Sequence, residues 1–156
     1  MRIRLAVVLA LVTLVYGAPP AGAADAPQGM FTPDAIKWGD APPSLPKGAK
    51  LAVLYGDPSK DGLFVVRVKL PANYKIAAHS HPTDEVVTVL SGTFLVGMGD
   101  KLAPASAKAF PAGSLIVAPA KVNHFAMTKQ PTVLEISAMG PLALIYVNPA
   151  DDPSKK

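Results

Sequence analysis

Short hydrophobic runs separated by turn residues fill most of the chain from Leu51 to Val147. The runs have the length and the β-branched composition of strands, and the separators are rich in glycine, proline and aspartate. No helical pattern longer than about ten residues interrupts them. The predicted strands are 51–55, 63–70, 74–81, 85–90, 93–98, 114–118, 124–128, 132–139 and 142–147. This pattern predicts an all-β fold, an antiparallel sandwich or barrel.

The segments on either side of this region have a different texture. Residues 24–50 contain several prolines and no sustained periodicity, so we expect an extended arm that wraps the domain and is anchored by Trp38. Residues 149–156 are polar and contain proline, which predicts a frayed tail. The predicted folded domain is therefore 51–148.

The first residues have the three-part form of a secretory signal. Arg2 and Arg4 precede an apolar run from Leu5 to Tyr16, and Ala21-Gly22-Ala23 is a small-residue cleavage site. The run is shorter than the roughly 20 residues of a membrane span. We therefore expect residues 1–23 to be a signal peptide, with cleavage after residue 23 or 24. The mature protein is then expected to be periplasmic or secreted, with no membrane contact after cleavage.

Charge and cysteine content narrow the function classes. The chain carries 15 Lys+Arg and 11 Asp+Glu, and loss of Arg2 and Arg4 with the signal lowers the net charge from +4 to +2. The lysines are scattered without interleaved aromatic residues, which argues against nucleic acid as a partner. An exported chain with no cysteine has no disulfides, so its core or a metal must hold the fold.

Ser91-Gly92 is a plausible two-residue turn between two predicted strands. A hairpin closed by this turn places Val87 opposite Val96 and Glu85 opposite Met98. Cross-strand partners share a face. The residues expected on one interior face are Glu85, Val87, Val89, Phe94, Val96 and Met98. A glutamate on an apolar face is costly unless it is paired or bound to a cation, so Glu85 should have a partner.

Two of the chain's three histidines stand in one tripeptide, His79-Ser80-His81. Side chains alternate faces along a strand, so His79 and His81 should point the same way. Imidazole is a common ligand of transition metals, and Glu85 could supply a carboxylate donor. The alternative is a solvent-facing strand that carries two histidines and binds nothing.

The spacing resembles the two motifs of the cupin superfamily, G(X)5HXH(X)3,4E(X)6G and G(X)5PXG(X)2H(X)3N. The first fits from Asn73 to Gly92 and the second from Gly113 to Thr128. Asn73 and Lys121 replace glycines of the motifs, and Thr128 replaces the asparagine; lysine suits the expected turn before His124 less well than glycine. The positions that usually bind metal in this superfamily are all retained: His79, His81, Glu85 and His124.

The resemblance implies a small antiparallel jelly-roll barrel, or double-stranded β-helix, with one mononuclear metal site inside. Such proteins are often homodimers, and the largely apolar face of Val86, Thr88 and Leu90 needs cover from the arm or a second subunit. Phe94, Val96, Met98 and Phe125 are the expected pocket residues, with plain core packing as the alternative. Arg67 alternates with apolar residues and is expected on the outer face.

Three imidazoles and one carboxylate accept Zn, Mn, Fe, Ni, Co or Cu, so the ligand types do not select one divalent transition metal. Metal loading outside the cytoplasm favours Cu and Zn; we expect zinc to occupy the site, and iron or manganese if the chemistry is redox. The predicted function is binding or conversion of a small oxygenated organic molecule by dioxygenase- or hydrolase-type chemistry, with Glu85 as a ligand or a base. A non-catalytic periplasmic module that binds metal or a small ligand is the main alternative. A sugar isomerase or epimerase ranks below both.

Overall fold

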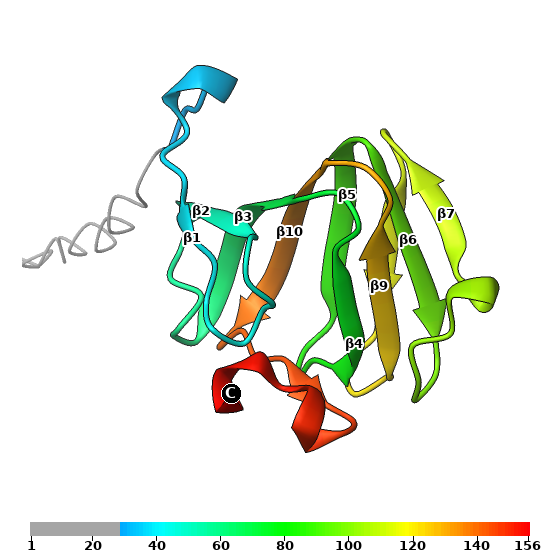
Figure 1. Ribbon diagram of the computed structural model, residues 1–156. Helices are drawn as coiled ribbons and strands as arrows, with labels where there is room; N and C mark the ends of the chain where they lie inside the picture. The colour runs from blue at the N-terminus through cyan, green and yellow to red at the C-terminus, as the bar shows by residue number, and fades with distance from the viewer. Residues whose placement is uncertain (1–28) are drawn as a thin grey trace, which may run out of the picture.

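Two antiparallel sheets pack face to face around a common interior (Figure 1). The computed structural model describes residues 29–156, so the predicted signal peptide and the first residues of the arm lie outside the described part. The six-stranded sheet has the order β1-β2-β3-β10-β5-β8 and the five-stranded sheet the order β11-β4-β9-β6-β7. The all-β jelly-roll prediction is confirmed.

Most strands follow the hydrophobic runs of the sequence, although the strands at 39–40 and 108–111 were not predicted and the run 142–147 forms a strand only at 145–146. Their bounds are β1 Gly39–Asp40, β2 Lys50–Tyr55, β3 Gly62–Leu70, β4 Lys75–Ser80, β5 Glu85–Ser91, β6 Thr93–Met98, β7 Lys108–Pro111, β8 Leu115–Ala118, β9 His124–Thr128, β10 Thr132–Gly140 and β11 Ile145–Tyr146. Single-turn 3-10 helices occur at Pro33–Ala35, Pro104–Ser106, Pro149–Asp151 and Pro153–Lys155. None of the helices in residues 29–156 is long and apolar enough to cross a membrane.

The predicted hairpin between β5 and β6 is wrong. β5 pairs with β10 and β8 in one sheet, whereas β6 pairs with β9 and β7 in the other. Ser91-Gly92 therefore carries the chain from one sheet to the other. Gly92 has a φ of +78°, and a Cβ there would collide with the backbone of Pro131 and Thr132, so this corner is packed tightly against the start of β10.

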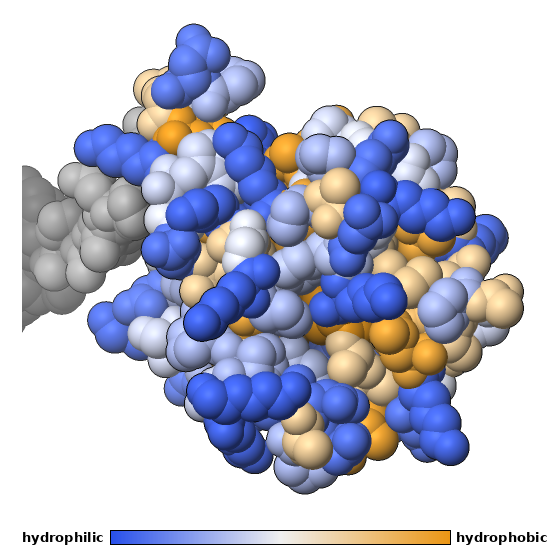
Figure 2. Space-filling model, viewed as in Figure 1, coloured by the Kyte–Doolittle hydropathy of each residue, from blue (hydrophilic) through white to orange (hydrophobic). Residues whose placement is uncertain are grey.

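The interior face is nevertheless close to the one expected, because both sheets look into the same space. Glu85, Val87 and Val89 from β5 are buried, as are Phe94 and Val96 from β6. Met98 is the exception: it is 58% exposed, because β6 ends there and the chain turns at Gly99. Figure 2 shows apolar surface gathered over the lower ends of β6 and β9, near this strand end.

Residues of the arm contribute to the interior as well as wrapping it. Ile36 is buried, and Trp38 is half-buried with the Lys69 ammonium 4.0 Å from its ring centroid. Further along, Leu45 packs against the core. The residues on either side of Leu45 are held by tyrosines of the five-stranded sheet. The Tyr146 hydroxyl donates to the Ser44 carbonyl at 2.7 Å, and the Tyr74 hydroxyl donates to the Pro46 carbonyl.

Two further expectations concern the surface. Arg67 lies on the outer face of β3, where its Nε is 2.8 Å from a carboxylate oxygen of Glu135 on β10. The tail does not fray as expected: Asn148 and Asp152 accept backbone hydrogen bonds from Ala150 and Ser154 and so cap the two 3-10 helices there.

Candidate metal centre

The three histidines converge inside the barrel from two neighbouring strands. His79 on β4 is the register partner of His124, the first residue of β9, and His81 directly follows β4. Their ring centroids lie 4.5 to 5.2 Å apart, and one candidate ligand atom from each lies within 4.8 Å of the others. All three side chains are buried. The fold thus brings together residues that are more than forty positions apart in sequence.

Backbone carbonyls fix the same tautomer in each histidine. Nδ1 lies 2.8 Å from the Ala77 carbonyl in His79, 2.9 Å from the Ala143 carbonyl in His81, and 3.1 Å from the Val122 carbonyl in His124. A carbonyl oxygen can only accept, so each Nδ1 carries the proton and each Nε2 keeps a free lone pair. This is how metal-binding imidazoles are usually oriented.

The Nε2 atom of His81 supports this interpretation further. It is buried and has no hydrogen-bond partner among the described residues. A buried polar atom without a partner is costly, and a bound cation would satisfy it. The donor set therefore fits a divalent transition metal, and its composition does not distinguish one such metal from another.

Burial keeps the histidines neutral, which is the form that binds metal. It lowers the pKa of His79 to about 3, with a further lowering from His124 beside it. Burial likewise lowers the pKa of His81 and of His124, against the opposing effect of their backbone hydrogen bonds. At neutral pH no proton has to leave these rings before a metal binds.

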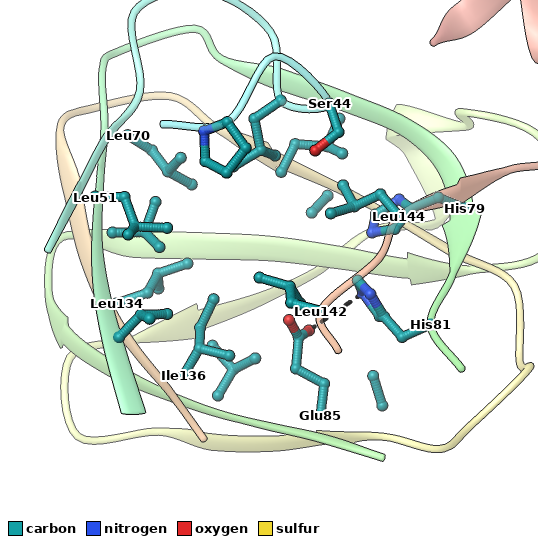
Figure 3. Close-up of a pocket in the computed structure, with 18 of the residues that line it drawn as sticks. Ser44, Leu51, Leu70, His79, His81, Glu85, Leu134, Ile136, Leu142 and Leu144 are labelled. Carbon is teal, nitrogen blue, oxygen red and sulfur yellow. Dashed lines mark ion pairs between the residues drawn. The ribbon is translucent and has the colours of Figure 1, made fainter. Parts of the chain in front are cut away.

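Glu85 begins β5 and points toward the histidines from the other sheet (Figure 3). Its Oε2 lies 3.5 Å from Nε2 of His81, too long for a hydrogen bond. Burial raises the pKa of the carboxyl to about 7, while the nearby His124 acts in the opposite direction. The structure places Glu85 beside the three-histidine group and outside the cluster of close ligand atoms, which leaves both expected roles, ligand and base, available.

The turn that precedes His124 forms with lysine in place of the usual glycine. Lys121 adopts a left-handed φ of 63°, and its N–H donates to the His81 carbonyl at 2.8 Å. This bond ties the turn directly to the second histidine. The Asp84 carboxylate adds a second tie by accepting from the Ala120 N–H at 2.7 Å, a contact that no sequence motif predicts.

The other two departures from the motifs also retain their local structure. Asn73 is left-handed, with a φ of 59°. Thr128 holds the opposite end of β9, since its hydroxyl donates to the Pro71 carbonyl at 2.6 Å and accepts from the Tyr74 N–H at 3.1 Å. None of the three substitutions therefore disturbs the strands that position the histidines.

A cavity of about 310 Å³ adjoins the histidines. Phe94 and Val96 are among the residues that line it, as expected. Met98 and Phe125 do not line it, which corrects that part of the predicted pocket. Met98 is exposed at a strand end, and Phe125 alternates with the inward His124 and Ala126. The Phe125 ring packs on the opposite side of the sheet, in the space that a side chain at Gly97 would need.

Sequence reasoning missed the walls that close the cavity. They come from three segments outside the metal motifs: Pro42 to Leu45 of the arm, Pro58 and Ser59 of the β2–β3 loop, and Leu142 and Leu144 after β10. Tyr146, a candidate acid or base from its residue type alone, lies close to the centre: its ring is 5.8 Å from that of His79, and its hydroxyl holds the arm. No local pattern marks these residues, because their positions depend on long-range packing.

Comparison with known families agrees with the geometry. The model of the ChrR cupin-like domain family matches residues 27–143. The chain belongs to this cupin family. Among curated proteins, no sequence matches this cupin.

Solved structures share the fold at low sequence identity. This cupin resembles the polyketide cyclase RemF from Streptomyces resistomycificus, with a TM-score of 0.64, 17% identity, and 82% of this chain and 91% of that one covered. An RmlC-like cupin from Shewanella frigidimarina gives a TM-score of 0.55 at 18% identity, covering 72% and 91%. KdgF from Halomonas gives 0.54 at 22% identity, covering 70% and 92%. At these identities the likeness concerns the fold alone.

Proposed function

We propose that the protein binds one divalent transition metal through His79, His81 and His124, with Glu85 beside them, and uses it to bind or convert a small oxygenated organic molecule. The observation that carries the proposal is the orphaned, buried Nε2 of His81 within a group of three neutral imidazoles of one tautomer. Zinc is the first choice for occupancy, and iron or manganese for redox chemistry.

A bound metal of this kind supplies Lewis acidity and an open position for an oxygen donor. The chain's own residues supply the rest. The carbonyls of Ala77, Val122 and Ala143 hold the rings in place, and the surrounding apolar walls exclude water. The Glu85 carboxyl, whose Oε2 lies 3.5 Å from Nε2 of His81, is the group placed to accept or release a proton beside a bound ligand.

A non-catalytic module that holds a metal or small ligand is the second candidate. One observation favours it: among residues 29–156, Ser44 and Ser59 are the only polar side chains besides the histidines and Glu85 that line the cavity. A reaction that needs a second acid or base would have to do without one. RemF, a polyketide cyclase, supports the enzyme hypothesis only as an example of catalysis on this fold.

The location and assembly belong to the same proposal. The pattern of the first 23 residues supports export, and the proposal is that the mature protein loads its metal in the periplasm or outside the cell. A homodimer is the proposed assembly, with a small molecule as the ligand and neither nucleic acid nor membrane as a partner.

The decisive experiment is elemental analysis of protein purified from its native compartment, together with His79→Ala and His124→Ala. We expect near-stoichiometric transition metal in the native protein and at least a hundredfold weaker binding in either variant. Asn123→Ala is the matched control, because Asn123 adjoins His124 but its side chain bonds Asp100. A folded native protein that binds no transition metal at neutral pH would refute the proposal.

Oxygen-consumption and ester-hydrolysis screens on the loaded protein then separate the two candidates. Activity that disappears in Glu85→Gln while metal content stays constant supports the enzyme. Loaded protein that binds organic ligands but turns over none of them supports the binding module.

A further inference from the structure

The cavity has one polar end, and the rest of its wall is apolar (Figure 3). The histidines and Glu85 lie together on one side. Branched aliphatic side chains line the rest of the wall: Leu51, Leu70, Leu134 and Ile136 lie across the cavity from the histidines, whereas Leu142 and Leu144 lie beside them (Figure 3). No lysine, arginine, asparagine or glutamine is among the described residues that line the cavity.

The two serines in the lining add little polarity. The Ser59 hydroxyl donates to the Asp57 carboxylate at 2.6 Å and is therefore already engaged. The carbonyl of Ser44 accepts from Tyr146, which leaves only the Ser44 hydroxyl free to meet a ligand. A ligand inside this cavity would find polar partners at the histidine end and almost none elsewhere.

The size of the cavity limits the ligand. An apolar cavity of about 150 Å³ holds a benzene molecule, so the 310 Å³ found here suits a body about twice that size. Roughly ten to fifteen non-hydrogen atoms would fill it. This volume is at the small end for organic ligands.

The placement of polar groups at one end of the cavity argues against most polar ligands of that size. Each ligand hydroxyl buried against the aliphatic wall without a partner would weaken binding roughly tenfold or more. A carboxylate at that wall would be worse, since no cation lines it. Sugars and sugar acids, which carry oxygen on nearly every carbon, are therefore poorly matched to this site.

We propose that the ligand of the histidine centre is an amphiphilic small molecule: an apolar body of one or two rings, or an equivalent chain, with a single oxygen donor at one end. The inference deepens the proposed function and rests on it, because the oxygen end is held by the metal that the histidines bind. The apolar body packs between the aliphatic side chains of β3, β10 and the loop after β10.

Fluorescence titration with 2-naphthol, with naphthalene as the analogue that lacks the oxygen, tests both halves of the inference. Zinc-loaded protein should bind 2-naphthol at least tenfold more tightly than naphthalene, and metal-free protein should bind the two within about threefold of each other. Glucuronate, measured by competition, should bind at least a hundredfold more weakly than 2-naphthol. Glucuronate binding that equals or exceeds that of 2-naphthol would overturn the inference.

A cavity-filling variant identifies the site of binding. Ile136→Phe places a larger side chain in the cavity and should weaken 2-naphthol binding at least tenfold at unchanged zinc content. Val133→Phe on the same strand is the matched control, because its register partner Lys69 lies on the outer face. Leu142→Phe, in the loop after β10, replaces Ile136→Phe if circular dichroism shows that the latter misfolds. Unchanged affinity in folded variants would refute binding in this cavity.

Failure of the proposed function has a different signature. One outcome is that zinc fails to bind while naphthalene and 2-naphthol bind equally well, and both more weakly to Ile136→Phe. That result supports an apolar ligand body in this cavity and refutes the proposed metal site. If zinc binds tightly but neither naphthyl probe does, the metal site stands and the amphiphilic ligand is refuted.

Discussion

At the scale of single residues, the centre is prepared by groups that a list of ligands would omit. Carbonyls of Ala77, Val122 and Ala143 set the tautomer of three imidazoles in the same way, although Ala143 comes from a different part of the chain. When no metal is present, Glu85 destabilises the folded protein, because its charged carboxylate is buried without a positive partner. The site is thus organised for a cation before one binds.

The metal-free protein should therefore lose stability as the pH rises, and Glu85→Gln should prevent that loss. The carboxyl has a folded-state pKa of about 7 against a usual value of 4.5, so its stabilising contribution is complete below pH 4.5 and disappears as the pH rises through 7. As the pH rises from 5 to 8, the free energy of unfolding of the variant should increase relative to that of the parent protein by on the order of 3 kcal/mol. Urea unfolding in the presence of a chelator measures this difference.

The histidines titrate in the opposite sense and provide an internal check. Their pKa values are lowered by burial, so they destabilise the metal-free fold as the pH falls below about 6.5 in both proteins. That acid loss should be similar in the parent and in Glu85→Gln. If the free energy of unfolding changes with pH in the same way in both proteins above pH 5, the charged form of Glu85 does not destabilise the fold and the prediction is wrong.

At the scale of elements, the turn before β9 should improve when it regains the glycine of the cupin motif. Lys121 is held at a φ of 63°, which costs a side chain about 1 kcal/mol more than it costs glycine. Lys121→Gly should therefore stabilise the protein by about 1 kcal/mol. Lys108→Gly, at the start of β7, is the control and should destabilise. Thermal unfolding measures both, and a loss of stability in Lys121→Gly would show that its side chain contributes contacts.

The arm should depend on two tyrosine hydroxyls. Tyr146→Phe removes the donor to the Ser44 carbonyl, so hydrogen exchange in the arm near Leu45 should become several-fold faster while the strands stay protected. Tyr55→Phe is the control, since no hydrogen bond of its hydroxyl occurs in the described residues. Equal exchange in the two variants would mean that packing alone holds the arm.

The strands and the histidine cluster could be predicted because they depend on local signals: alternation along each strand and a fixed spacing around His79 and His81. The pairing of β5 with β6 could not. A two-residue turn such as Ser91-Gly92 looks the same whether it closes a hairpin or changes sheets, and packing against Pro131 and Thr132 decides between them. β7 was missed because four residues that end in proline carry too little periodicity.

For the protein as a whole, the notable feature is that the outer face of the six-stranded sheet carries several exposed apolar side chains beside its charged ones. Leu63, Leu115, Val117 and Met139 are each more than half exposed, and their register partners place them on the same side of the sheet. Large exposed apolar patches usually mark interfaces. This is the face that Val86, Thr88 and Leu90 led us to expect would need cover, and the described part of the arm leaves it open.

We therefore predict a homodimer that pairs these faces and dissociates when charge is placed on them. Val117→Lys should raise the dimer dissociation constant at least tenfold, because a buried ammonium facing its own copy has no partner. Sedimentation velocity over a concentration series measures the change. Met98→Lys is the comparison, because Met98 is equally exposed but lies on the five-stranded sheet. A monomeric parent at high micromolar concentration would refute the dimer, and dissociation in Met98→Lys alone would place the interface on the other sheet.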